Sequence, residues 1–209
     1  MFTSYALAVI VDFLAEVATE YRLDAITLHV AVRYLDRILG TSDVAKSQLQ
    51  LVAICCLLAA GTWLAICHAT ISSHAGRFAA KYEEPESKVP PVEGLNECSN
   101  HAYTSSMIHQ MEVRVLNALQ WRLGVITPLH FLLYYVDEGV VCPGDLIENR
   151  PCSDKMLRYT IQYCRFFCDL CLQGTFRCRL PFGNSSLTRC LNLQSTLFNS
   201  TRPPSLRPQ

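Results

Sequence analysis

Apolar residues recur every three or four positions through most of the first 173 residues, which is the period of amphipathic helices rather than of strands. One stripe lies between Asp24, which can cap a helix N-terminus, and Gly40, which can end the helix. Thr127 and Pro128 open a further helix with a capping hydroxyl and a proline at the first helical position. The stripes are Ile10, Phe13, Leu14 and Val17; Leu28, Ala31, Val32, Leu35, Ile38 and Leu39; and Ile108, Met111, Val115 and Leu119. We therefore predict a compact all-α bundle.

The most hydrophobic segment is Leu51–Cys67, a run of 17 residues without a charge. Its length reaches the lower limit for a membrane span. Alanines, Gly61 and Thr62 dilute its hydrophobicity, however, and the amphipathic helices need an apolar element on which to pack. We favour a buried central helix over a membrane span.

Segments of other character divide the chain. Residues 84–98 form a proline-rich connection, and residues 137–153 form a linker that contains Gly139, Pro143, Gly144 and Pro151. Helical spacing returns over residues 154–173. From Gly174 to Gln209 the chain is rich in Ser, Thr, Asn, Arg and Pro without a stable period, so we predict a disordered tail.

Composition is that of a folded globular protein, with 50% hydrophobic and 17% charged residues. Lys plus Arg and Asp plus Glu number 18 each, so nothing in the charge predicts a nucleic-acid or membrane partner. The 11 cysteines are odd in number and scattered through apolar segments, where a thiol behaves as a small hydrophobe. No signal peptide is evident at Met1, so we expect a reducing compartment, the nucleus and cytoplasm.

Two patterns imitate metal sites. Cys164, Cys168 and Cys171 have the spacing of an iron–sulfur cluster, but on a helix this spacing also forms one buried face, which we favour. Near His68 and His74, the Cys and carboxylate residues do not complete a zinc set. No phosphate-binding glycine loop, nucleophile elbow or H-E-x-x-H occurs, so we expect no catalytic residue, metal or cofactor, and no enzyme.

Several phrases along the chain together resemble a cyclin box. They are Thr27–Arg37 (TLHVAVRYLDR), Leu49–Ala53 (LQLVA), Ala80–Glu84 (AKYEE), Met111-Glu112, Trp121–Leu123 (WRL) and Thr127–Leu132 (TPLHFL). The resemblance implies a five-helix bundle over residues 5–136. The connection from Glu83 to Asn96 is similar to the cyclin J subgroup, and residues 154–173 resemble the first helix of a second cyclin repeat, truncated here.

The resemblance also implies a function and a site. Cyclins bind and activate a cyclin-dependent protein kinase, and so regulate the cell cycle. In the family, the residues that match Lys81 and Glu112 hydrogen-bond to backbone groups of the kinase beside its regulatory helix. Tyr82, Leu116 and Leu123 would form the apolar pocket next to them. Taken alone, Lys81 is more often a solvated helix end and Glu112 an exposed or salt-bridged side chain, so the expectation depends on the family context.

A groove for docking of kinase substrates is a weaker expectation. The family's substrate-docking helix carries Met, Arg and Trp at positions that are all replaced within Ala6–Phe13 of this chain. A residual groove would comprise Val9, Ile10, Phe13, Glu16, Leu49 and Gln50.

The chain departs from the family at residues 61–79, an insertion in what should be the third helix, and again after Gln173. We expect an overlong helix that runs past Ala60, bends near residues 72–76 and resumes before Lys81. Both departures begin with Gly-Thr, whose codons can contain a splice donor, so we interpret them as retained intron sequence. The alternatives to a kinase regulator are a cyclin-fold adaptor or non-functional gene-model product without kinase binding, and a transcription-factor module, which the charge balance disfavours.

Overall fold

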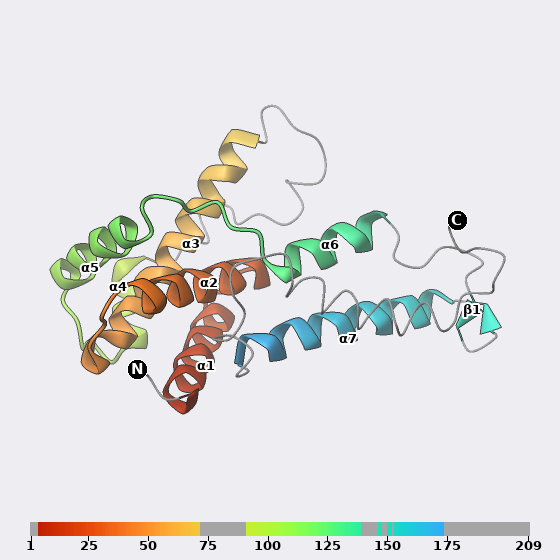
Figure 1. Cartoon of the computed structure of the whole chain (residues 1–209), viewed down its shortest axis with the longest axis horizontal. Helices are drawn as coiled ribbons and strands as arrows, with labels where there is room; N and C mark the ends of the chain where they lie inside the picture. The colour runs from red at the N-terminus through yellow and green to blue at the C-terminus, as the bar shows by residue number, and fades with distance from the viewer. Residues whose placement is uncertain (1–3, 72–90, 139–145, 148–149, 152, 174–209) are drawn as a thin grey trace. The chain divides into compact units, whose positions relative to one another are not determined.

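The computed structural model describes residues 4–71, 91–138, 146–147, 150–151 and 153–173. The chain divides into two compact units, one that extends to Thr127 and also includes Leu172–Gly174, and one that begins at Pro128. Helices dominate the described residues of both units, which confirms the predicted all-α class (Figure 1).

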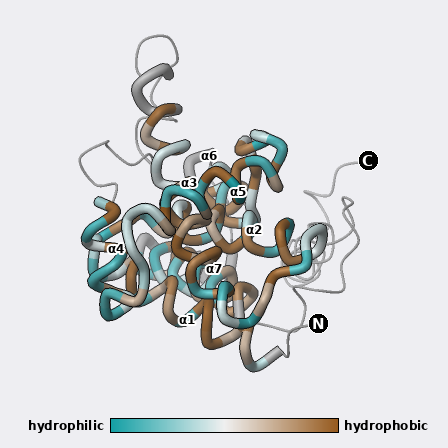
Figure 2. Tube along the Cα trace, turned by 90° about the vertical axis from the view of Figure 1, so that its left-hand side faces the viewer, coloured by the Kyte–Doolittle hydropathy of each residue, from teal (hydrophilic) through white to brown (hydrophobic). Residues whose placement is uncertain are grey.

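The first unit is a helical bundle built around one central helix, α3. This helix contacts α1, α2, α5 and the short η1 segment, while α4 packs on α5. Hydrophobic and hydrophilic stretches alternate along the helices of the bundle (Figure 2). The elements are α1 (Ser4–Glu20), α2 (Ala25–Thr41), η1 (Lys46–Gln48), α3 (Leu49–Ile71), α4 (Val92–Cys98) and α5 (Ser105–Ala118).

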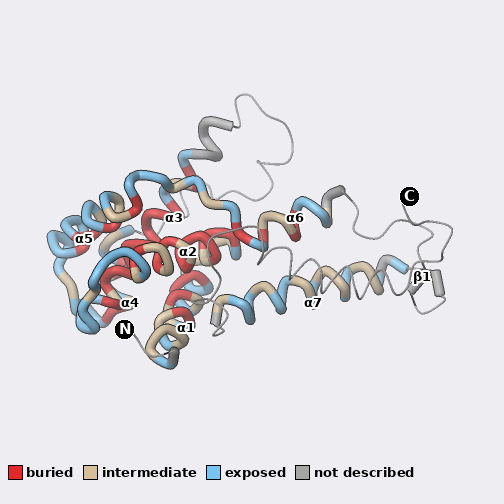
Figure 3. Tube along the Cα trace, in the orientation of Figure 1, coloured by how far each residue is buried: buried red, intermediate tan, exposed pale blue. Residues whose placement is uncertain are grey.

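Burial explains the place of α3 at the centre. Every residue from Leu51 to Gly61 is buried, on all sides of the helix, so α3 has no polar stripe to turn toward solvent (Figure 3). The stretch Lys46–Ile66 is long and apolar enough to cross a membrane, but 78% of its most hydrophobic window is buried inside the protein. This burial favours the predicted core helix.

The helix ends follow local capping chemistry. The Asp24 carboxylate accepts a 2.9 Å hydrogen bond from the Ile26 N–H, which confirms the predicted N-cap of α2. The predicted end of α2 at Gly40 was wrong by one residue. The helix continues to Thr41, and the Ser42 N–H donates to the Ile38 carbonyl. The helix α5 begins after Thr104, whose hydroxyl accepts from the Met107 N–H at 3.3 Å.

The helix α4 corrects the prediction that residues 84–98 are only a connection. Pro91 precedes its first turn, where a proline does not disturb helical hydrogen bonds. Leu95 is fully buried, and Gly94 is buried against the Tyr21 ring at the end of α1. The Tyr21 hydroxyl occupies the space that a Cβ at position 94 would need, and it hydrogen-bonds with the Cys98 side chain. Proline-rich composition concealed this helix, whose one apolar turn is too short for a periodic signal.

The second unit contains α6 (Pro128–Glu138), a short antiparallel pair β1 (Leu146–Ile147) and β2 (Arg150–Pro151), and α7 (Asp154–Gln173). The start of α6 at Pro128 was predicted, and so was a helix over residues 154–173. The predicted linker, 137–153, was not expected to contain strands. Two-residue strands cannot show the alternation by which a sequence predicts a strand.

The predicted insertion lies partly within α3. The helix runs past Ala60 to Ile71, as expected for an overlong third helix. The remainder of residues 61–79, with the expected bend, and the predicted disordered tail 174–209 lie outside the described residues. The domain boundaries at 5–136, 137–153 and 154–173 stay predictions.

We predict that Gly94→Ala destabilises the protein by about 1–2 kcal/mol, although alanine is the better helix former. The new methyl group would displace Tyr21 from α4 and break its bond with Cys98. Chemical denaturation measures the change in the free energy of unfolding. The matched control is Gly40→Ala, where no atom lies within 4 Å of the added Cβ, and which we expect to stabilise α2 by about 0.5–1 kcal/mol. Equal effects of the two substitutions would contradict the packing of Tyr21 on Gly94.

Candidate functional site

The structure brings three of the five predicted kinase-binding residues to one part of the first unit. Glu112 and Leu116 lie one turn apart on the same side of α5, and both are half-buried. Leu123, also half-buried, follows the turn that ends this helix. Lys81 and Tyr82 lie outside the described residues.

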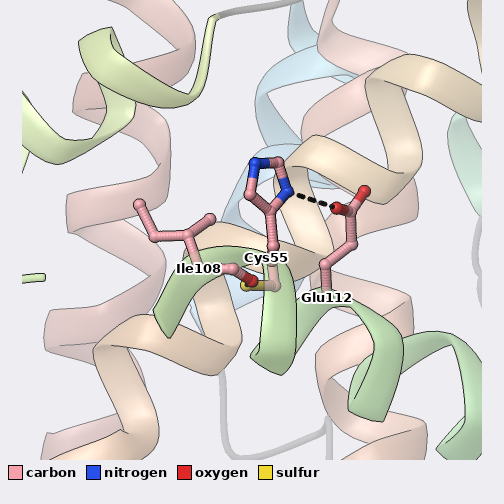
Figure 4. Close-up of polar contacts among 4 residues, drawn as sticks. Cys55, Ile108 and Glu112 are labelled. Carbon is pink, nitrogen blue, oxygen red and sulfur yellow. Dashed lines mark hydrogen bonds and ion pairs between the residues drawn. The ribbon is translucent and has the colours of Figure 1, made fainter. Parts of the chain in front are cut away.

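Glu112 is held at the edge of the contact between α5 and α3 (Figure 4). Its side chain is 25% exposed, and its Oε2 atom lies 3.7 Å from Nδ1 of His109, one turn earlier on α5. The His109 side chain is 63% exposed, and the contact is an ion pair only when the imidazole is protonated. The carboxylate is thus oriented by a weak, solvent-accessible contact that a stronger hydrogen-bond donor could replace.

Cys55 of α3 lies beneath Glu112 and ties the two helices together. Its thiol donates a 3.5 Å hydrogen bond to the carbonyl oxygen of Ile108 (Figure 4). Burial, and then the negative charge of Glu112, raise the pKa of the Cys55 thiol to about 12. The Glu112 carboxylate is therefore close enough to raise the pKa of a buried thiol, while part of the side chain stays open to solvent.

The position of Leu123 depends on α2. Two consecutive residues with left-handed backbone, Gln120 and Trp121, reverse the chain after α5, each with φ of 55°. Such residues are unfavourable unless surrounding contacts hold them. Here the fully buried Tyr34 donates a 2.6 Å hydrogen bond to the Leu123 carbonyl.

Arg37, one turn further along α2, contacts the same turn after α5, at residues on both sides of Gln120 and Trp121. Its guanidinium donates to the Arg122 carbonyl at 2.7 Å and to the Leu119 carbonyl at 3.2 Å. The Leu119 carbonyl also accepts a 3.1 Å bond from the Arg122 N–H, so Arg37 adds a second donor to a turn that already has its own backbone bond. Together, Tyr34 and Arg37 fix the backbone that presents Leu123.

The predicted substrate-docking residues lie on α1 and at the start of α3. Val9 and Glu16 are exposed, whereas Ile10, Phe13 and Gln50 are half-buried. The Gln50 side chain accepts a 3.2 Å hydrogen bond from the Tyr103 hydroxyl. Leu49 is only 5% exposed, so its side chain serves the core and offers little surface to a ligand. Glu16 also lines an open depression on α1 with Asp12, Ala15, Thr19 and Glu20.

The cysteines with iron–sulfur spacing lie on one helix. Cys164 and Cys168 are half-buried and Cys171 is exposed, all on the continuous helix α7. Within the described ranges, no three His, Cys, Asp or Glu side chains cluster so that they could hold a metal ion. The side chains of His68 and His74 lie outside the described part of the chain.

Sequence reasoning missed His109, Tyr34 and Arg37. His109 precedes Glu112 by three residues, a spacing that places two side chains on one helix face, so the signal was present. Tyr34 and Arg37 belong to a phrase that carries the family resemblance, but their partners, Leu123 and Arg122, are more than 80 residues away. No local pattern could have identified that contact.

Comparison with known proteins decides the family. The family model described as "Cyclin, N-terminal domain" matches residues 2–76 and 77–124, which is more than half of the chain. The chain belongs to the cyclin family. Its two matched segments meet between residues 76 and 77, within the stretch 61–79 that the cyclin resemblance sets apart as an insertion.

Similar proteins come from several cyclin subgroups. Cyclin-D of Ostreococcus tauri is 33% identical over 170 residues, which cover 79% of this chain and 40% of that protein. Human Cyclin-J is 31% identical over 174 residues, 80% of this chain and 41% of that protein. Human G2/mitotic-specific cyclin-B2 is 37% identical over 125 residues, 60% of this chain and 26% of that protein. The chain thus spans about 40% of the length of the first two cyclins.

We predict that Tyr34→Phe lowers the free energy of unfolding by about 1–2 kcal/mol, because the Leu123 carbonyl loses a buried donor. Chemical denaturation measures the loss, and hydrogen exchange should quicken around residues 119–123. Tyr5→Phe, at a side chain that is 80% exposed, is the control and should leave stability unchanged. A stable Tyr34→Phe protein with unchanged exchange would contradict the anchoring of Leu123 by α2.

We also predict that stability falls as the pH rises above 9. The pKa of Cys55 is raised from 9.0 to about 12 in the folded protein, so its thiol ionises first in the unfolded chain. The stability that the neutral thiol contributes is complete below pH 9 and is lost toward pH 12, at no more than about 1.4 kcal/mol per pH unit. Denaturation of the wild type and Cys55→Ala in reductant should show a shallower decline for the variant. Parallel declines would contradict the burial of this thiol.

Proposed function

We propose that this cyclin-family chain is a regulatory subunit that binds and activates a cyclin-dependent protein kinase and so regulates the cell cycle. The observation that carries the proposal is the placement of Glu112 beside Leu116 on α5, half-buried, with Leu123 held after the same helix. These are residues to which the family resemblance assigns kinase contact. They combine a carboxylate with apolar side chains that are partly open to a partner.

In the proposed complex, Glu112 accepts a hydrogen bond from a backbone N–H of the kinase beside its regulatory helix. Such a charge-assisted bond is stronger than a neutral one and fixes position when the interface excludes water. Leu116 and Leu123 supply apolar area for an aliphatic side chain of the kinase. Lys81 and Tyr82 complete the set in the proposal, from outside the described residues.

Activation follows from the mechanism of protein kinases. The kinase needs a lysine of its β3 strand paired with a glutamate of its C-helix before ATP phosphates are held correctly. A subunit that binds the inward position of this helix more tightly shifts the kinase toward its active state. This chain would supply no catalytic group of its own, so we propose no enzymatic activity, no cofactor and no metal. A reducing nucleus and cytoplasm suit its thiols.

The second candidate is a cyclin-fold adaptor without kinase binding. One observation favours it: α3 continues to Ile71, past Ala60, the point from which a cyclin would proceed directly to the phrase that holds Lys81. Displacement of Lys81 would remove one of the two charged contacts. Co-purification of a kinase with the tagged chain distinguishes the two candidates, because an adaptor would retain no kinase.

We predict that Glu112→Ala weakens binding to the cognate kinase by about 1–3 kcal/mol, or roughly 5- to 150-fold in Kd, because a buried donor of the kinase loses its acceptor. Binding is measured by calorimetry against cyclin-dependent kinases, and activation by phosphorylation of a peptide. Glu112→Gln should recover part of the affinity, since its amide oxygen still accepts.

The control for this prediction is Glu93→Ala, which removes an exposed carboxylate from α4 and leaves α5 intact. It should bind as the parent does. If Glu112→Ala and Leu116→Ala both bind with parental affinity to a kinase that the parent activates, the α5 surface is not the interface.

A further inference from the structure

The helix α7 carries an exposed aromatic face that the proposed function does not use. Five large apolar side chains of this helix are exposed to solvent. They are Tyr159 (52% exposed), Tyr163 (62%), Phe166 (53%), Phe167 (60%) and Leu170 (44%). Exposed apolar residues scattered singly need no explanation, but a contiguous stripe of five on one helix marks an interaction surface.

This stripe is separate from the stripe that contains the cysteines. Leu157, Ile161, Cys164 and Cys168 are half-buried and lie on the opposite side of α7. At 20 residues, α7 is about 30 Å long, so each face has room for a helix-length contact. One apolar face is therefore partly covered within the chain, and the other is open.

The spacing of the open face is that of helix pairing. The half-buried Met156 and the exposed Tyr159, Tyr163, Phe166 and Leu170 follow one another at intervals of three, four, three and four residues. These are the intervals of the seam between two helices in a coiled coil. Lys155, Gln162 and Asp169 recur at intervals of seven along one edge of this seam, and the Lys155 ammonium lies 5.9 Å from the centre of the Tyr159 ring.

The charges along this edge favour one occupant. When two copies of α7 lie antiparallel, the same edge of each helix faces its counterpart, centred near Gln162. Lys155 of one copy then faces Asp169 of the second copy, twice per pair, and Tyr159 packs on Tyr163. A parallel pair would place Lys155 opposite Thr160 and Gln162 opposite Phe167, without any opposite charges.

We propose that the aromatic face of α7 is a self-association surface, which pairs antiparallel with α7 of a second copy of this chain. If each of the five exposed side chains loses about 100 Å² to solvent, the pair buries roughly 1,000 Å² in total, the lower limit of a specific interface. The dimer is therefore weak, reversible and dependent on concentration. The contact is formed by α7 and uses neither Glu112 nor Leu116 of α5.

The first test is sedimentation velocity of the full 209-residue chain over a range of concentrations. The parent should show a reversible monomer–dimer equilibrium, and Tyr163→Glu should raise its dissociation constant at least tenfold. Tyr5→Glu, at an aromatic residue that is 80% exposed on α1, is the matched control and should dimerise as the parent does. A parent that stays monomeric, or a dimer that Tyr163→Glu leaves intact, overturns the proposal.

The second test addresses orientation with charge reversals at exposed positions, which preserve the fold more readily than changes in the seam. Lys155→Glu and Asp169→Lys should each weaken the dimer about tenfold, since each places like charges opposite one another twice per pair. The double variant should recover the affinity of the parent. Circular dichroism checks that α7 stays helical, and failure of the double variant to recover overturns the antiparallel pairing.

Discussion

Burial of α3 on all sides is the constraint on which the first unit depends. Because every residue from Leu51 to Gly61 is buried, this helix must be surrounded, and the amphipathic helices α1, α2 and α5 each turn an apolar stripe toward it. The Cys55 thiol adds one directional bond, to the Ile108 carbonyl, within this otherwise apolar contact. Packing on α3 thereby orients α5, and with it Glu112.

The apolar part of the proposed kinase site is fixed from a second direction. Leu123 follows two left-handed residues whose conformation is unfavourable in isolation, and α2 offsets that cost through Tyr34 and Arg37. The site thus depends on contacts between segments more than 80 residues apart. A substitution in α2 can disturb the proposed interface without touching a partner.

Sequence periodicity predicted the long helices and their chemistry at Asp24 and Pro128, because capping and proline geometry act within a few residues. It failed for α4 and the two-residue strands, which contain too few residues to express a period. For the proposed site, the family phrases predicted Glu112, Leu116 and Leu123, and their role in kinase binding stays a prediction. The burial of Leu49, which the same resemblance placed in a docking groove, depends on the packing of α3, which no local pattern specifies.

The predicted insertion begins where α3 changes from fully buried to partly exposed. Thr62 and Ile66 are exposed, yet Leu64 and Ala65 are only 8% and 6% exposed. The burial pattern of α3 therefore changes at Thr62 from all-round to one-sided, the pattern of a helix that lies on a bundle surface rather than within it. The first turn of residues 61–79 contributes buried apolar area and is continuous with the central helix. Whatever the origin of this segment, its beginning is integrated into the central helix and into its buried surface.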